Sequence, residues 1–175
     1  MYLYLMRHAE AVDPGTDGAQ SDSARALTEK GRRQSRRMGT ALRRLGVEPD
    51  LILTSSLARA VETGRLVGEE LDADAPKRAL DELAPSGGAE AAWQALRRQQ
   101  GTSVLVVGHL PSIARLAGWL LGCGDGEPLH FHKGSLAALH GDGNARNPAF
   151  EVEWLLAPGT VKRLAARGTH GEERS

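Results

Sequence analysis

An arginine and a histidine stand side by side where the first apolar run of the chain ends. Tyr2 to Met6 has the continuous apolar composition of a buried strand, and Arg7 and His8 follow it directly. An imidazole can attack phosphorus, and a guanidinium group can bind two phosphate oxygens at once. The pair therefore predicts that His8 is a nucleophile for a phosphoryl group and that Arg7 is part of the cationic clamp around that group.

Two more residues of the same types follow two other predicted strands. Arg59 comes one helical turn after the apolar run Leu51 to Leu53, and His109 comes just after the run Ser103 to Val107. In sheets of mostly parallel strands, ligands bind beyond the carboxyl ends of the strands. We therefore expect Arg59 and His109 to join the first pair at one edge of a sheet, where the four side chains form a pocket for a dianion.

Buried strands that alternate with amphipathic helices must position these residues. Strands are predicted over 2–6, 51–53, 77–80 and 103–107, with a hairpin over 135–140 and 150–156, and helices over 29–45, 57–71, 89–100, 111–121 and 160–166. This order predicts an α/β fold, a three-layer sandwich with a mostly parallel central sheet flanked by helices.

Helical spacing also predicts which side chains the first two helices bury. Thr28 is the expected N-cap of the first helix, whose inner face includes Leu45. The second helix should bury Val61, and Ser55 and Ser56 are its candidate caps, which could add donors for a phosphate at the helix N-terminus. The many arginines of the first helix are interpreted as a solvated face.

The composition limits the class of function. Lysine plus arginine and aspartate plus glutamate number 22 each, so no net charge attracts nucleic acid or an anionic membrane. Cys123 is the single cysteine, which excludes an internal disulfide and indicates a reducing compartment. No apolar run is long enough to span a bilayer, and Met1 to Met6 lacks the features of a secretion signal. We expect a cytoplasmic protein with one domain over 1–167 and a flexible tail over 168–175.

A pair of histidines outside this constellation raises the question of a metal. His130 and His132 would share one face of a strand, which is a known start for a metal site. Only the distant His140 offers a third ligand, so a polar strand edge is the favoured interpretation. We therefore predict no metal and no cofactor, with arginines supplying the positive charge.

Four runs share their order, spacing and composition with a known family. They are Leu5-Met6-Arg7-His8-Ala9-Glu10, Ser21 to Gly31, Thr54 to Thr63, and Val106 to Pro111. In these runs the chain resembles the histidine phosphatase superfamily, with its phosphoglycerate mutase-like fold, and within it the small phosphohistidine phosphatases of the SixA type. The resemblance implies that His8 is the phosphorylated nucleophile and that Arg7, Arg59 and His109 complete the phosphate pocket. The C-terminal third matches only in outline.

The proton for the leaving group has a less clear source. Glu82 precedes a Gly-rich loop, and the general acid of the resembling family follows the second arginine at a similar distance. A surface carboxylate without a catalytic role is an equal alternative for Glu82. Glu10, next to the nucleophile in sequence, is a weaker candidate for the acid.

The resemblance implies hydrolysis of phosphohistidine on a signalling or phosphocarrier protein, such as a histidine phosphotransfer domain. One alternative is a phosphomonoesterase for a small phosphorylated metabolite, and another is a phosphoprotein-binding module without turnover. The loops over 9–26 and 81–88 are the only obvious lid material, and both are short. An open site suits a protein-borne substrate. The sequence leaves the oligomeric state open, and a monomer is compatible with it.

Overall fold

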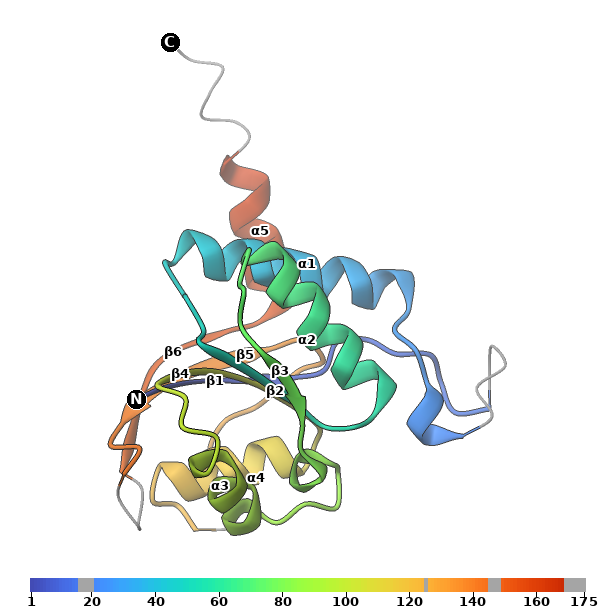
Figure 1. Ribbon diagram of the computed structural model, residues 1–175. Coiled ribbons are helices and arrows are strands. Elements are labelled where there is room, and N and C mark those ends of the chain that lie inside the picture. The colour runs from blue at the N-terminus through green and yellow to red at the C-terminus, as the bar shows by residue number, and fades with distance from the viewer. Residues whose placement is uncertain (16–20, 125, 145–148, 169–175) are drawn as a thin grey trace.

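The computed structural model describes residues 1–15, 21–124, 126–144 and 149–168, which form a sheet between two layers of helices (Figure 1). The strands are β1 (Tyr2–Arg7), β2 (Leu51–Thr54), β3 (Lys77–Ala79), β4 (Ser103–Gly108), β5 (Leu136–Gly141) and β6 (Phe150–Leu156). Their order is β3-β2-β4-β1-β5-β6, in which β1 to β4 run parallel and β5 and β6 form the antiparallel hairpin. The predicted sandwich with a mostly parallel sheet is confirmed. Of the predicted tail, residues 169–175 lie outside the described part of the chain.

Two sets of helices cover the two faces of the sheet (Figure 1). One set consists of α1 (Glu29–Arg44), α2 (Ala58–Glu70) and α5 (Pro158–Gly168), and the other of α3 (Ala89–Arg97) and α4 (Ser112–Leu120). Two short 3-10 turns, η1 (Asp22–Ala24) and η2 (Asp81–Leu83), lie in the connections after β1 and β3. None of the described helices is long and apolar enough to cross a membrane.

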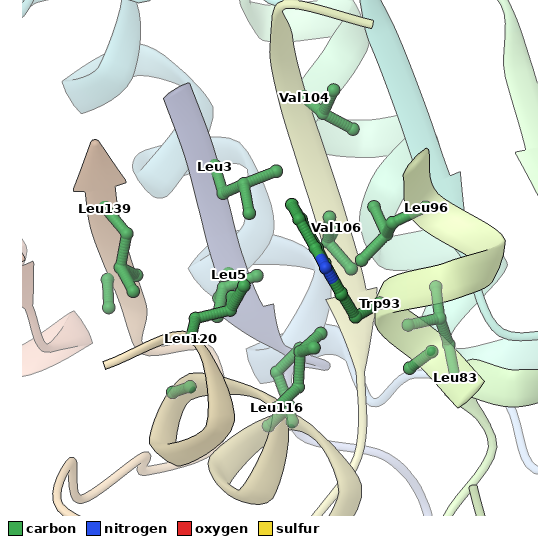
Figure 2. Packing of buried hydrophobic residues seen from close by; sticks show 14 of the residues in the cluster. Leu3, Leu5, Leu83, Trp93, Leu96, Val104, Val106, Leu116, Leu120 and Leu139 are labelled. Carbon is green, nitrogen blue, oxygen red and sulfur yellow. The ribbon is translucent and has the colours of Figure 1, made fainter. Parts of the chain in front are cut away.

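Alternation along β1 divides the core into two parts. Leu3 and Leu5 pack in a cluster with Trp93 of α3 and with side chains of α4 (Figure 2). Tyr4 and Met6 point to the other face, into a cluster with side chains of α1 and α2. Burial on both faces explains why this strand is continuously apolar, and it holds the carboxyl end of the strand rigidly.

One residue on the predicted buried side of α2 is exposed. Val61 is 43% exposed, whereas Arg59 and Thr63 are buried. A Cβ atom built on Gly64 would lie only 2.7 Å from Cγ2 of Thr54, so the helix packs against β2 through its small residues. The prediction for Val61 was wrong because this close approach turns Val61 to solvent.

The ends of the first two helices also bear on the site. Thr28 caps α1 as predicted, and its Oγ1 accepts a main-chain N–H from the first turn at 3.0 Å. Leu45 lies just past the end of α1 and is 56% exposed, so its predicted burial was wrong. The N-cap position of α2 is Leu57 and not Ser55 or Ser56, with no side-chain cap. Because α2 begins this late, Ser55 is left for a different contact.

Candidate active site

The carboxyl end of β4 lies between those of β2 and β1, and the predicted residues gather there. The main-chain N–H of His8 donates to the carbonyl of Gly108 at 2.9 Å, which extends the pairing of the two strands by one residue. The imidazole rings of His8 and His109 lie next to each other, with their centroids 4.8 Å apart. The strand order, which the sequence does not show, thus makes the two histidines neighbours.

The hydrogen bond of His8 defines its tautomer. Nδ1 lies 2.7 Å from the carbonyl oxygen of Ala9, which can only accept, so Nδ1 carries the proton and Nε2 keeps its lone pair. The side chain is buried, and burial lowers the pKa of His8 to about 4. The charges of Arg59, Arg7 and Lys133 lower this pKa as well, against the opposing effect of the hydrogen bond to Ala9. His8 is therefore a neutral imidazole with a free nitrogen at neutral pH.

This protonation state can be measured directly. We expect the ¹⁵N chemical shifts of His8 to show a neutral ring protonated at Nδ1 throughout pH 5.5 to 8, because its lowered pKa keeps the ring neutral until the pH nears about 4. Protonation of His8 with a midpoint near 6.5 would contradict this description of the free site.

Arg7 is anchored at one end of its guanidinium group. Nη1 donates to the carbonyl of Phe131 at 2.9 Å, whereas Nε is buried without a hydrogen-bond partner among the described residues. Burial also lowers the pKa of Arg7, although an arginine stays charged at any physiological pH. The main-chain carbonyls of Arg7 and His8 both accept the N–H of Gly134, at 3.1 and 3.0 Å. These contacts hold Arg7 in place and leave one inward N–H for another acceptor.

Arg59 is nearly fully buried, with 4% of its surface exposed. Its Nη1 donates to the main-chain carbonyl of Asp22 at 2.7 Å, and its Nη2 forms an ion pair with the Asp22 carboxylate at 3.0 Å. The Asp22 carboxylate also accepts from Arg25, and hydrogen bonds from Arg25 and Arg59 lower the pKa of Asp22. We did not identify Asp22 or Arg25 as site residues from the sequence. Both residues lie in the run Ser21 to Gly31, which contributes to the family resemblance but for which no contact with the site was predicted.

His109 is buried against a serine. The Oγ of Ser55 lies 2.6 Å from Nε2 of His109, while Nδ1 is buried without a hydrogen-bond partner in the described part of the chain. Burial lowers the pKa of His109 to about 3, and the charges of His8 and Arg59 lower it further. Ser55 was predicted to serve at the helix N-terminus; its Oγ accepts the N–H of Leu57 there at 3.4 Å, and its shorter contact is with His109.

The buried polar atoms without partners point to an anion site. Among the described residues there are six such side-chain atoms, and they include Nε of Arg7, Nε of Arg59 and Nδ1 of His109. An unpartnered buried polar atom is costly and requires an explanation. All three of these residues lie close to His8: the charges of Arg7 and Arg59 lower its pKa, and the His109 ring lies next to its ring in a tilted arrangement. A group with several acceptor oxygens bound next to His8 supplies the missing partners.

Glu82 lies in η2, a turn that packs against the carboxyl ends of β2 and β4. The N–H of Leu80 donates to the carbonyl of Thr54 at 2.8 Å, and Ser112 Oγ donates to the carbonyl of Leu83 at 3.4 Å. Glu82 is partly exposed in this turn. Its role as general acid remains a prediction. Glu10 is less suited to that role, because Lys30 hydrogen-bonds its carboxylate and lowers its pKa.

The two histidines considered for a metal do not lie in a strand. His130 and His132 precede β5, and their rings meet edge to face with centroids 4.6 Å apart. The predicted strand at these positions was wrong, because β5 begins only at Leu136. The residues that the structure describes contain no group of three or more histidine, cysteine or acidic side chains that could hold a metal ion.

A mostly parallel sheet that gathers two histidines and two arginines at its carboxyl edge defines an α/β protein built around an anion site. Residues 3–84 match the model of the histidine phosphatase superfamily (branch 1). The phosphohistidine phosphatase SixA of Escherichia coli (strain K12) is 34% identical over 169 residues, which cover 95% of this chain and 99% of that protein. The chain therefore belongs to the histidine phosphatase superfamily, and the resemblance found in the sequence is confirmed.

The structural similarity extends over nearly the whole chain. The structure of the protein histidine phosphatase SixA complexed with tungstate superimposes with a TM-score of 0.78 at 32% identity, covering 92% of this chain and 99% of that one. A shorter match links the chain to the mitochondrial serine/threonine-protein phosphatase Pgam5 of Drosophila ananassae, which is 36% identical over 76 residues. That match covers 43% of this chain and 25% of the relative. The C-terminal third, which fits the family only in outline by sequence, is thus included in the similarity to SixA.

Proposed function

We propose that this protein hydrolyses phosphohistidine carried by another protein and that the reaction passes through a phosphohistidine intermediate on His8. The observation that carries the proposal is the state of His8, a buried neutral imidazole whose Nδ1 proton is held by Ala9 and whose Nε2 is free to attack. The unpartnered nitrogen atoms of Arg7, Arg59 and His109 support it, because they can bind the oxygens of the transferred group.

The first step forms one bond to phosphorus and breaks another. His8 Nε2 attacks in line, and the electron pair of the broken P–N bond leaves with the imidazole of the substrate, which takes up a proton. The protein assists mainly by positioning and by positive charge, since the phosphoryl group carries most of the negative charge on its equatorial oxygens. Arg7 and Arg59 supply that charge, so the proposed reaction needs no metal ion.

The second step returns His8 to its starting state. Water attacks phosphorus, the bond to Nε2 breaks with its electron pair returning to the ring, and inorganic phosphate leaves with the hydroxyl of the water. The second proton of the water is released to solvent and balances the proton that the substrate imidazole took up in the first step. A bound dianion favours the protonated form of His109, so the pKa of His109 should rise from about 3 when phosphate binds. His109 can then donate a hydrogen bond to a phosphoryl oxygen.

The choice of a protein-borne phosphohistidine rests on the leaving group and on the relatives. An imidazole released from phosphohistidine needs little help from an acid, whereas an alkoxide from an ester needs a strong one. The similarity to SixA over almost the full length supports the same substrate class for this protein. We further propose that the substrate is a protein such as a histidine phosphotransfer domain in the cytoplasm, which agrees with the single, exposed cysteine.

The substrate class is tested by comparing specificity constants. A purified histidine phosphotransfer domain carrying phosphohistidine and a panel of small phosphate esters are offered to the same preparation. We expect kcat/KM for the phosphoprotein to exceed that for every ester in the panel. A strong preference for one phosphorylated metabolite would instead establish the alternative, a phosphomonoesterase.

Glu82 offers a second test of the leaving-group argument. We expect Glu82→Gln to slow the hydrolysis of a phosphate ester by roughly 10²-fold, and the hydrolysis of phosphohistidine much less, because only the alkoxide depends on a proton donor. The comparison uses kcat for both substrates and includes Glu90→Gln, an exposed glutamate on α3, as the control. Equal losses on both substrates would remove Glu82 from the role of general acid.

A further inference from the structure

The layer formed by α1 and α5 carries a strong excess of positive charge in a protein with no net charge. Glu29 is the one acidic residue among the 16 residues of α1, and α5 contains none. Some of the basic side chains of α1 are neutralised locally, since Arg32 pairs with Glu29 and Glu62 and Arg36 pairs with Glu69 and Glu70. Most of the other basic side chains of α1 and α5 therefore form a concentrated positive charge that nearby carboxylates of the described residues do not neutralise.

The unbalanced cations face the junction of the two helices. Arg33, Arg37 and Arg44 of α1 and Lys162 and Arg163 of α5 are exposed. None of these five side chains forms an ion pair within the described residues. Such an arrangement is unfavourable unless solvent or an anionic partner screens the charges.

These side chains line a continuous depression that we call the α1–α5 groove. Its central part, of ≈ 400 Å³, is lined by Arg33, Arg37 and Lys162 around an apolar floor of Met38 and Val161. Arg37 also lines a second depression, which includes Leu164. Gln34 and Pro158 also line a third depression, which includes Lys133. Among the residues that the structure describes, no carboxylate lines any of the three depressions.

The α1–α5 groove begins beside the nucleophile. Gly134, whose N–H binds the carbonyls of Arg7 and His8, lies against Pro158 of the groove, because a Cβ atom built on Gly134 would be 3.2 Å from Cγ of Pro158. Gln34 of the groove accepts the N–H of Glu10 at 3.1 Å. Lys133, the residue before Gly134, is close enough to contribute to the electrostatics of His8. A molecule that is bound at His8 and extends over Lys133 and Gly134 therefore contacts the groove.

We propose that the α1–α5 groove is the docking surface for an acidic surface patch of the phosphohistidine-bearing protein, an inference that rests on the proposed function. A protein that presents its phosphohistidine to His8 has surface on every side of that residue. Carboxylates around a few apolar side chains complement the cations and the apolar floor of the groove. The described lining contains no phenylalanine, tyrosine or tryptophan, so it offers no platform on which nucleic acid bases would stack.

The test separates docking from chemistry by using two substrates. The double variant Arg33→Glu/Arg37→Glu is assayed with a phosphorylated histidine phosphotransfer domain and with free phosphohistidine. We expect kcat/KM for the phosphoprotein to fall at least about tenfold, and kcat/KM for free phosphohistidine to stay within about twofold. Arg98→Glu, an exposed arginine at the end of α3 on the opposite face, is the matched control and should change neither value. Raising the salt concentration should slow the wild type on the phosphoprotein but not the double variant.

The outcomes distinguish this proposal from the proposed function. If the wild type hydrolyses neither phosphohistidine substrate, the proposed function fails. If the wild type hydrolyses both and the double variant keeps full activity on the phosphoprotein, the docking surface is wrong while the function stands. Binding of duplex DNA or of anionic lipid vesicles that the double variant loses, without a loss on the phosphoprotein, would assign the groove to those ligands and overturn the proposal.

Discussion

The substitution His8→Ala is expected to reduce kcat on every phosphorylated substrate by roughly 10⁴-fold or more, because it removes the atom that attacks phosphorus. The fold should survive the change. The main-chain N–H of His8, which donates to Gly108, is retained, and within the described part of the chain the side chain hydrogen-bonds only to the adjacent Ala9 carbonyl. The measurement is the steady-state rate on free phosphohistidine and on a generic phosphate ester, with the folded state checked by circular dichroism.

The control for this substitution is another histidine of the chain. His130→Ala alters an exposed histidine outside the site and should leave the rates unchanged. Full activity of the His8→Ala variant would show that a different group attacks phosphorus. A chain that binds phosphoprotein but hydrolyses nothing, even as wild type, would instead fit a binding module.

Arg59→Ala is expected to lower kcat by about 10²- to 10⁴-fold, because arginines that stabilise the charge of a transferred phosphoryl group contribute on this scale. Arg59 is buried, and its Nε has no partner among the described residues, so it is held ready for an acceptor. Arg59→Lys should recover only part of the loss, since an ammonium group cannot bind two oxygens in the planar geometry of a guanidinium group. The measurement separates kcat from KM on one ester and on free phosphohistidine.

The same helix supplies the control for Arg59. Arg65 of α2 is half exposed and pairs with Glu69, so Arg65→Ala should leave both kinetic constants near those of the wild type. A variant Arg59→Ala with an unchanged kcat and a raised KM would show that Arg59 binds substrate and transition state equally. That result would show that Arg59 does not specifically stabilise the reacting phosphoryl group.

The convergence of the four site residues could be expected from the sequence, because each follows a buried apolar run and parallel strands end at one edge of the sheet. The contacts that these residues make with one another could not be expected from the sequence. The position of β4 between β1 and β2 makes His109 a neighbour of both His8 and Ser55, and this order depends on how the crossover connections pack. The sequence gives no local signal for that choice.

The partner of Arg59 shows a second limit of sequence reasoning. Asp22 lies 37 positions before Arg59, in a polar stretch without periodicity, so no spacing rule connects them. The exposure of Val61 was equally hidden, since Val61 fits a helical apolar stripe and only the close approach of Gly64 to β2 shows that it faces solvent. In both cases tertiary contacts decided between arrangements that local patterns permit.

The interpretation of the α1 arginines changed for a related reason. As a list of residues on one helix they indicate a solvated face, and Arg32 and Arg36 do pair with glutamates on the surface. In the folded protein α5 packs across α1 (Figure 1). This packing places other arginines of α1 in the lining of the groove, next to Gly134. If these arginines only form a solvated face, reversing the charge of Arg33 and Arg37 should leave kcat/KM for a protein substrate unchanged. If they line a docking groove, it should lower that kcat/KM.

The most direct test of the whole account is to trap the phosphorylated enzyme. The protein is mixed with a phosphohistidine substrate, quenched in alkaline denaturant within milliseconds, and digested for mass spectrometry and ³¹P nuclear magnetic resonance. We predict a single phosphoryl group on Nε2 of His8, formed and lost at rates consistent with turnover and absent from His8→Ala. A wild-type enzyme that turns over without any phosphorylated intermediate, or one phosphorylated at another residue, would contradict the account.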